Sequence, residues 1–149
     1  MRNVLDRERP IEEFADVIDL IACNRQEWQK LAEPQRVDSL VAVVSVTDGP
    51  AGGSVRYTDP QGERCEYRIG AFPRARPPRD TNRAGEAYAW ALLSSLCGFG
   101  WAGGSARSEW VEAAAQRASA AAALVLDRTG FGFPTLVEVE ATLRHGRVE

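Results

Sequence analysis

The sequence LVAVVSVTDGPAG, residues 40–52, joins an almost continuously apolar run to a glycine-containing turn. A run this rich in Val predicts a parallel strand, Leu40–Thr47, that is buried on both faces. Asp48, Gly49 and Pro50 then end the strand sharply. Open α/β sheets bind ligands outside the carboxyl ends of such strands, where glycines let the backbone approach a ligand closely. The turn is therefore a candidate ligand site, and an ordinary strand-end turn is the alternative.

Strand signals lie on both sides of this run. Residues 14–23 end in a β-branched apolar stretch, and Asn24 follows where a strand would hand over to a helix beginning near Gln26. Residues 53–59 and 65–72 alternate in polarity around the turn sequence PQG. This pattern predicts an antiparallel hairpin.

Two long helical patterns follow a connector rich in Pro and Arg. The first, residues 84–97, is apolar on nearly every side, so we expect a helix buried within the domain that stops at Gly98. The second, residues 108–126, is rich in Ala and has Ser105 or Ser108 as its expected N-cap.

A third helix is predicted over residues 134–143, where Thr135 is the N-cap and Glu138 completes a capping-box pattern. The order of strands and helices predicts an α/β fold: a partly parallel sheet with flanking helices, plus one antiparallel hairpin. At 149 residues the chain is long enough for one core, so we treat residues 1–149 as a single domain.

Composition argues against several classes of protein. Apolar residues make up 44% of the chain, and no apolar run approaches the roughly 20 residues that span a bilayer. A net charge of -3 gives no general attraction to nucleic acid. We therefore expect neither a membrane nor a nucleic acid as partner. No secretory signal is visible, which predicts a cytoplasmic protein whose Cys23, Cys65 and Cys97 are reduced, since their spacing fits neither a zinc site nor a disulfide framework.

The segment DTNRAGE, residues 80–86, opens the first long helix with small residues. The amides at a helix N-terminus, together with the helix dipole, form a site for negative charge, such as the charge that develops on a transferred phosphoryl group. An acid at the end of the segment, here Glu86, can accept the proton of an attacking hydroxyl as a general base.

Four segments in this order resemble those of ribokinase-like (PfkB-family) carbohydrate kinases, specifically their C-terminal, nucleotide-binding half. DTNRAGE is similar to the family's D-T-x-G-A-G-D signature, TDGPAG to its T-x-G-x-x-G turn, and NRQE to its N-x-x-E segment. Residues 116–135 resemble the alanine-rich helix and glycine-containing loop that border the adenine. The resemblance extends over residues 15–143, with the family's N-terminal sugar-binding half and its lid expected to be missing.

This resemblance implies half of a doubly wound, Rossmann-like domain and ATP-dependent phosphoryl transfer to a sugar hydroxyl, with ATP and Mg²⁺ as cofactors. Glu86 would be the catalytic base, and the backbone amides of Ala84, Gly85 and Glu86 would form the anion hole. Glu27 would help to place Mg²⁺ indirectly, through water. The residues implied in nucleotide binding are Thr47, Gly49, Gly52, Asp80 and Thr81. Half of such a domain would expose a sheet edge, so we expect a homo-oligomer or a complementing chain.

The sequence departs from the family pattern at the same site. Glu86 stands where the family has Asp, so its carboxylate reaches one methylene further. Arg83 replaces Gly or Ala beside the anion hole, where its charge would grip a phosphate or its bulk would fill the site. Pro77 and Pro78 replace β-branched residues. These changes leave a second interpretation open: a non-catalytic nucleotide-binding protein, or a structural, partner-binding relic of such a kinase.

Simpler interpretations exist for several of these residues. An acidic residue such as Glu27 is favoured in any first helical turn, and Asp80 with Thr81 can form a turn and cap. The four Trp residues suggest core or interface positions rather than base stacking. His145 has no partner in sequence and is not expected to be catalytic. The arginines at positions 74, 76, 79 and 83 form a basic cluster, for which contact with a nucleic-acid backbone is one interpretation. Without interleaved aromatic residues or a recognition helix, a solvated loop is favoured.

Overall fold

The computed structural model describes residues 11–77, 83–128 and 132–148. In chain order its elements are η1 (Ile11–Phe14), β1 (Leu20–Asn24), α2 (Arg25–Gln29), α3 (Pro34–Leu40), β2 (Val43–Thr47), η2 (Gly49–Ala51), β3 (Gly53–Thr58), β4 (Arg64–Ile69), α4 (Ala84–Phe99), α5 (Ser108–Leu126) and α6 (Leu136–His145). The two elements labelled η are single turns of 3-10 helix.

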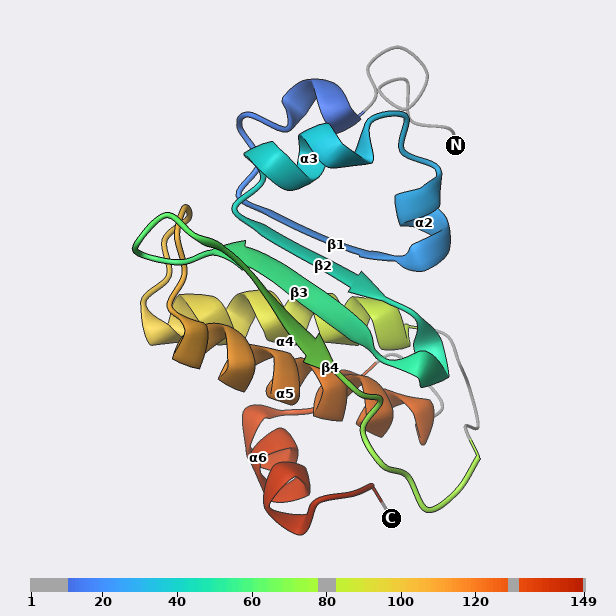
Figure 1. Ribbon diagram of the computed structural model, residues 1–149. Coiled ribbons are helices and arrows are strands. Elements are labelled where there is room, and N and C mark those ends of the chain that lie inside the picture. Colours follow the sequence, from blue (N-terminus) through green and yellow to red (C-terminus); the bar gives the residue numbers. More distant parts are fainter. Residues whose placement is uncertain (1–10, 78–82, 129–131, 149) are drawn as a thin grey trace.

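The four strands form one sheet in the order β1-β2-β3-β4 (Figure 1). β1 and β2 run parallel, with Ala22 opposite Ser45, and α2 and α3 form the crossover that a parallel pair requires. β3 and β4 follow as an antiparallel hairpin in which Val55 lies opposite Tyr67. Among the described residues, β2 is the only strand that pairs with β1, which is therefore an edge strand.

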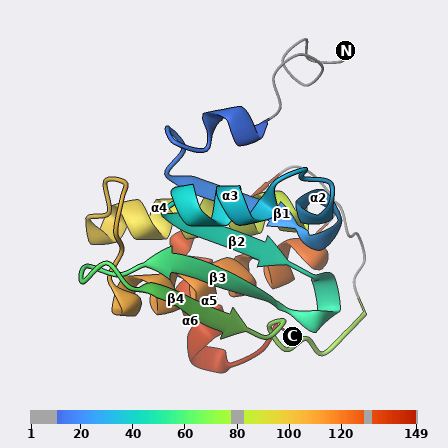
Figure 2. The ribbon, with the colours of Figure 1, turned by 45° about the horizontal axis from the view of Figure 1, so that its top comes forward.

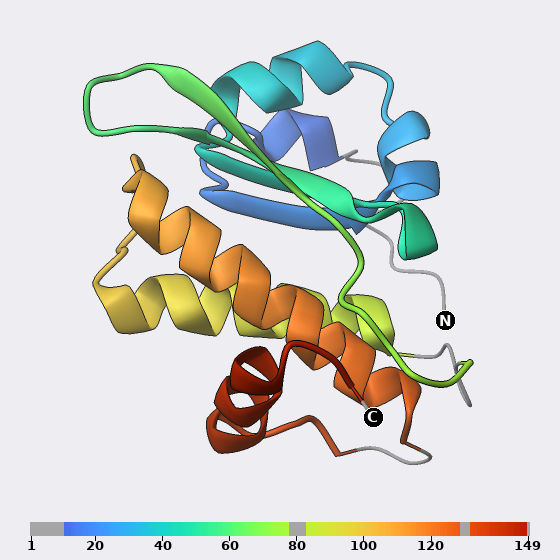
Figure 3. The ribbon, with the colours of Figure 1, turned by 60° about the horizontal axis from the view of Figure 1, so that its bottom comes forward.

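Helices cover the sheet on both sides (Figure 3). α4 and α5 pack against each other under one face, and α6 packs against α5 on the side away from the sheet. α2 and α3 lie over β1 and β2 on the other face, where β3 and β4 are left uncovered (Figure 2). The sheet is thus covered completely on one face and partly on the other.

Strand β2 supplies side chains to both layers of the core. Val43 faces the cluster under α4 and α5, which includes Val55, Leu92, Leu96 and Val111. Val44 and Val46 belong to the cluster beneath α3. This alternation explains why the strand is apolar at almost every position.

The predicted fold class is confirmed: the sheet is partly parallel, helices flank it, and the hairpin is antiparallel. Helix α5 has the predicted bounds, Ser108–Leu126. The predicted capping box of Thr135 with Glu138 is present, and Asn24 forms a second one with Glu27 that was not predicted.

The structure differs from the predicted helices in five respects. α4 does not stop at Gly98 but continues to Phe99, because the left-handed residue that ends it is Gly100. α4 is not buried on nearly every side either, since Trp90 is 61% exposed. The N-cap of α5 is Arg107, and the hydroxyl of Ser108 instead accepts a hydrogen bond from Tyr57. Helix α3 was not predicted at all. α6 runs to His145, two residues beyond its predicted end.

Within the described parts of the chain, no helix has the length and apolar character needed to cross a bilayer.

Candidate functional site

The turn after β2 places glycines where other residues would not fit. Gly52 has a φ of +89°, and a Cβ built on it would lie 2.2 Å from the carbonyl oxygen of Ile69. Gly49 has a φ of +52° but faces open space. The turn is closed by a 2.7 Å hydrogen bond from the amide of Asp48 to the carbonyl of Gly52. Gly52 is thus required by the fold, whereas Gly49 leaves room for a ligand.

The amino end of α4 lies close to this turn. Its first three residues are Ala84, Gly85 and Glu86, and the side chain of the N-cap residue, Arg83, makes no capping hydrogen bond. A Cβ built on Gly85 would meet no atom within 4 Å. The first amides of a helix have no partner within the helix, so those of the three predicted anion-hole residues can serve a ligand.

Arg83, the N-cap residue of α4, has a left-handed backbone with a φ of 68°. This conformation favours glycine and costs an L-residue about 1–2 kcal/mol. The Arg83 guanidinium lies 4.9 Å from the ring centre of Phe133. Its Nε lies 3.5 Å from Oε2 of Glu86. The departure from the family's Gly or Ala therefore places a cation against the proposed base.

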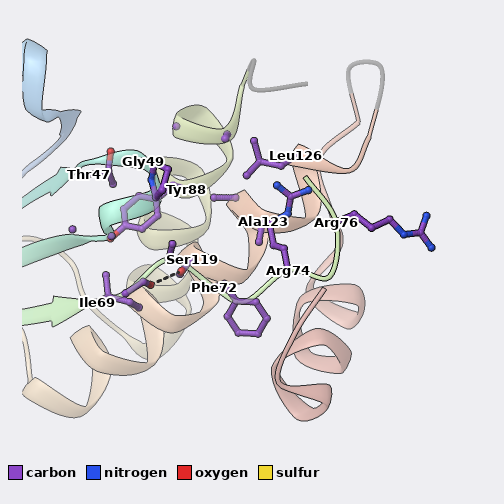
Figure 4. Close-up of a pocket in the computed structure, with 18 residues that line it drawn as sticks. Thr47, Gly49, Ile69, Phe72, Arg74, Arg76, Tyr88, Ser119, Ala123 and Leu126 are labelled. Atoms are coloured by element: carbon purple, nitrogen blue, oxygen red, sulfur yellow. Dashed lines mark hydrogen bonds between the residues drawn. The ribbon is translucent and has the colours of Figure 1, made fainter. Parts of the chain in front are cut away.

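A cavity of about 450 Å³ opens between the turn after β2, the amino end of α4 and the last turns of α5 (Figure 4). Thr47, Gly49, Gly52, Ala84 and Gly85 line one part of it. The remaining lining comes mainly from apolar residues of the segment after β4 and of α5, together with two arginines: Ile69, Gly70, Ala71, Phe72, Arg74, Arg76, Ser119, Ala122, Ala123 and Leu126. We call this the large cavity.

A second cavity, of about 330 Å³, adjoins it and is more polar. We call it the polar cavity. Its wall includes Thr47, Gly85 and Tyr88, which also line the large cavity, and the residues Ala22, Cys23, Asn24, Glu27, Arg83, Glu86 and Ala89. Glu27 and Glu86, both named as site residues in the sequence analysis, thus line the same cavity, although they are 59 positions apart (86 − 27).

Glu27 takes part in the local structure of α2 as well as lining the polar cavity. Its Oε2 accepts a 2.9 Å hydrogen bond from the amide of Asn24, and the Asn24 side chain accepts a 2.8 Å bond from the amide of Glu27. The reciprocal bonds fix the carboxylate at the strand end. The described residues bring no three His, Cys, Asp or Glu side chains together.

Burial strengthens the preference of two groups at the cavities for their neutral form. Burial raises the pKa of Cys23 to about 11, with Glu27 adding to the shift, so Cys23 remains a thiol at neutral pH. Burial also raises the pKa of the Tyr88 hydroxyl, which accepts a 3.0 Å hydrogen bond from Ser45 in the middle of β2. This hydrogen bond connects α4 to β2 and lies beneath the wall that the two cavities share.

Sequence reasoning missed the wall formed by the segment after β4. The Arg74 side chain is only 12% exposed and its Nη2 donates to Asp127 Oδ1 at the end of α5. The backbone around it is held by Val148, whose carbonyl accepts from Ala75 at 2.8 Å and whose amide donates to Pro73 at 2.9 Å. No local pattern connects residues so far apart. Asp80 and Thr81 lie outside the described residues, as does Arg79.

The remaining predicted residues are distributed as follows. Trp101 is buried, Trp28 and Trp110 are partly buried against the core, and Trp90 is exposed. The Arg56 guanidinium also lies over the Trp28 ring, and its Cζ is 5.1 Å from the ring centre. His145 is exposed in the last turn of α6, which lines neither cavity.

No protein-family model matches the sequence, and no curated protein is similar enough in sequence to match it. Solved structures are similar in fold. Ribokinase from Giardia lamblia superimposes with a TM-score of 0.72 at 20% identity, over 91% of this chain and 46% of that protein. Ribokinase from Thermotoga maritima gives 0.71 at 22% identity, over 93% and 46%.

A nucleoside kinase from Burkholderia thailandensis, solved in complex with inosine, gives a TM-score of 0.69 at 23% identity over 91% of this chain and 43% of that protein. The chain thus spans less than half of the length of each of these kinases. At such low identity the similarity concerns the fold. Over its described residues, this chain has the fold of part of a ribokinase-family sugar or nucleoside kinase.

Proposed function

We propose that the chain is a carbohydrate kinase-like protein that binds a nucleoside triphosphate, by resemblance ATP with Mg²⁺, and transfers its phosphoryl group to a sugar hydroxyl. The observation that carries this proposal is the pair of adjoining cavities, which share Thr47, Gly85 and Tyr88. The large cavity has the apolar lining that suits a base. The polar cavity contains the acid expected to act on an acceptor, and the amino end of α4 lies between the two.

In this proposal the phosphates lie against the amides of Ala84, Gly85 and Glu86, which stabilise the charge of the transferred group. Glu86 takes the proton of the attacking hydroxyl as the oxygen bonds to phosphorus and the bond to the nucleoside diphosphate breaks. Glu27 orients water in the polar cavity. The sugar-binding residues and the acceptor itself are left open, because the chain spans less than half of the kinases that it resembles.

One observation favours a second candidate, a protein that binds nucleotide without transferring phosphate. Glu86 is paired with Arg83, and its side chain is 69% exposed. A carboxylate engaged in an ion pair and largely exposed to water is not oriented toward an acceptor hydroxyl. A lack of turnover combined with nucleotide binding would support this candidate.

Nucleotide binding itself is tested by filling the open space at Gly85. We expect Mg-ATP to bind weakly in calorimetry and Gly85→Leu to weaken this binding at least tenfold, since a larger side chain there projects toward both cavities. The matched control is Gly98→Leu, in the same helix, where a Cβ also meets no atom within 4 Å but which lines neither cavity. Both variants remove a helical glycine, so each is expected to fold at least as stably as the parent.

Absence of heat beyond dilution at millimolar Mg-ATP would remove the nucleotide proposal. Equal weakening by the Gly85 and Gly98 variants would show that binding occurs elsewhere. The Gly49→Val variant adds a second test on the opposite wall, where we also expect weaker binding.

We further expect the protein to self-associate or to require a complementing chain. β1 has a free edge among the described residues, and α4 exposes Trp90, which is 61% accessible. Unpaired strand edges and exposed apolar side chains favour association. Light scattering at micromolar concentration is expected to give at least a dimer mass for the purified chain. A monomer at that concentration would contradict the self-association half of this prediction, and Trp90→Glu should lower the mass if α4 forms the contact.

A further inference from the structure

The segment after β4 places one guanidinium at the wall of the large cavity. Arg74 lines the cavity, and Figure 4 shows its side chain rising beside Ala123 and Leu126, whereas Arg76 extends away from the cavity. Phe72 and Ala122 contribute to the same wall. Apart from the ion pair of Arg74 with Asp127, this wall is apolar, which suits a planar base better than a phosphate group.

Arg74 is held in this position from several directions. Its Nη2 donates to Asp127 at the end of α5, and the hydrogen bonds of Val148 to Pro73 and Ala75 fix the peptide units on either side of it. The side chains of Arg74 and Asp127 are 12% and 22% exposed. A donor fixed in this way loses little freedom when a ligand binds, so it can discriminate between ligands effectively.

The charge of Arg74 is balanced by Asp127, but its hydrogen-bonding capacity is not used up. A guanidinium has five N–H donors, and one of those on Nη2 is engaged with Asp127. Nε is buried without a hydrogen-bond partner among the described residues, so the donors left for a ligand are those of the two Nη atoms. A neutralised guanidinium with spare donors suits a neutral acceptor such as a base carbonyl better than an anion.

We propose that Arg74 determines which base the cavity accepts, and that it favours a 6-oxopurine nucleotide, guanine or hypoxanthine, over an adenine nucleotide. This inference rests on the proposed nucleotide-binding function. An arginine donates to the O6 and N7 atoms of a 6-oxopurine, whereas the same donors face the N6 amino group of adenine. The assignment differs from the ATP that the family resemblance alone implies.

The test compares four Mg-nucleotides by calorimetry on the full chain: GTP, ITP, ATP and the triphosphate of 2-aminopurine riboside. ITP keeps O6 without the 2-amino group, and the 2-aminopurine compound keeps the amino group without O6. We expect GTP and ITP to bind about tenfold more tightly than ATP, and the 2-aminopurine compound to resemble ATP, since a good arginine contact discriminates by at least this factor.

The Arg74→Gln variant is then expected to lose the preference, with a GTP-to-ATP affinity ratio of about one or below, because Gln can pair with adenine. Arg68→Gln is the matched control, since Arg68 is 86% exposed on β4 and lines neither cavity. It should keep the preference. If removal of Arg74 alone leaves Asp127 uncompensated and the chain unfolds, the double variant Arg74→Gln/Asp127→Asn removes both charges.

The outcomes separate the two proposals. Binding of ATP as tight as that of GTP and ITP, or tighter, would overturn the role of Arg74 while leaving nucleotide binding intact. A preference for 6-oxopurines that survives in the Arg74 variants would equally overturn it. Failure of all four nucleotides to bind would instead remove the proposed function on which the inference rests.

Discussion

Replacing Glu86 by Gln is expected to lower any sugar-dependent turnover by about 10²–10⁴-fold, the range typical of a lost general base, while nucleotide affinity stays nearly unchanged. The reason is that the carboxylate accepts a proton only as the transition state forms, and its loss does not alter ground-state contacts of the phosphates with the amides of α4. Turnover is measured by release of nucleoside diphosphate with a panel of sugars and nucleosides, and affinity by calorimetry on the same samples.

Two further variants test the departures from the family pattern. Glu86→Asp restores the shorter side chain and should preserve or raise the rate. Arg83→Gly frees the carboxylate from its 3.5 Å ion-pair contact and relieves the left-handed backbone at that residue, so we expect the combined variant to be the most active. Glu109→Gln, in the exposed first turn of α5, serves as control.

Full turnover in Glu86→Gln would show that this residue is not the base. If no variant transfers phosphate to any acceptor, including the combined variant, the result would support the non-catalytic candidate. The next step would then be to look for a protein that completes the site. Nucleotide binding would then be the function carried by this chain alone.

The second large effect concerns the fold of the turn that carries the site. We expect Gly52→Ala to lower the free energy of unfolding by about 3 kcal/mol or more, since it combines a positive φ with a Cβ forced against backbone. That Cβ would lie 2.2 Å from the carbonyl oxygen of Ile69 and 2.9 Å from Cα of Gly70, and neither can move without shifting β4. Urea unfolding followed by circular dichroism measures the change.

Gly62 provides a matched control for the backbone contribution. Its φ is +86°, close to the +89° of Gly52, but a Cβ there would meet no atom within 4 Å. Gly62→Ala is therefore expected to cost only about 1–2 kcal/mol, the cost of the left-handed backbone alone. An equal decrease in the free energy of unfolding for both variants would contradict this prediction. It would mean that the turn shifts enough to remove the clash with Ile69 at no cost in stability.

Much of the fold could be predicted because local signals agreed with the tertiary structure. The Val-rich strand is buried on both faces, a helix follows Asn24, and the predicted capping box of Thr135 and Glu138 starts α6. Errors arose where the decisive interaction was not local. α3 is a seven-residue helix with little signal of its own, stabilised by burial of Val37. Gly98 was an uncertain stop signal, because glycine is tolerated inside a helix when tertiary packing supports it.

The residues of the candidate site likewise include some that local sequence patterns indicate and some that they do not. Thr47, Gly49 and Gly85 were found from strand-end and helix-start patterns, which mark the two edges of the cavities. Phe72 and Ser119 were not found, and Arg74 was named only as part of a basic cluster, because these residues reach the large cavity from a connector and from the middle of a helix. The pairing of Arg83 with Glu86 was also unforeseen, although the residues are three positions apart, since it depends on the backbone conformation of Arg83.

The bridge between Val148 and Arg74 has a practical consequence for anyone who handles the protein. The last described residue of the chain is hydrogen-bonded to the connector that forms one wall of the large cavity. Tension on a purification tag or surface anchor joined directly after this residue would therefore pull on that wall. A flexible glycine and serine spacer separates such an attachment from the connector, and an environment-sensitive dye placed there without a spacer would become a reporter of what the cavity contains.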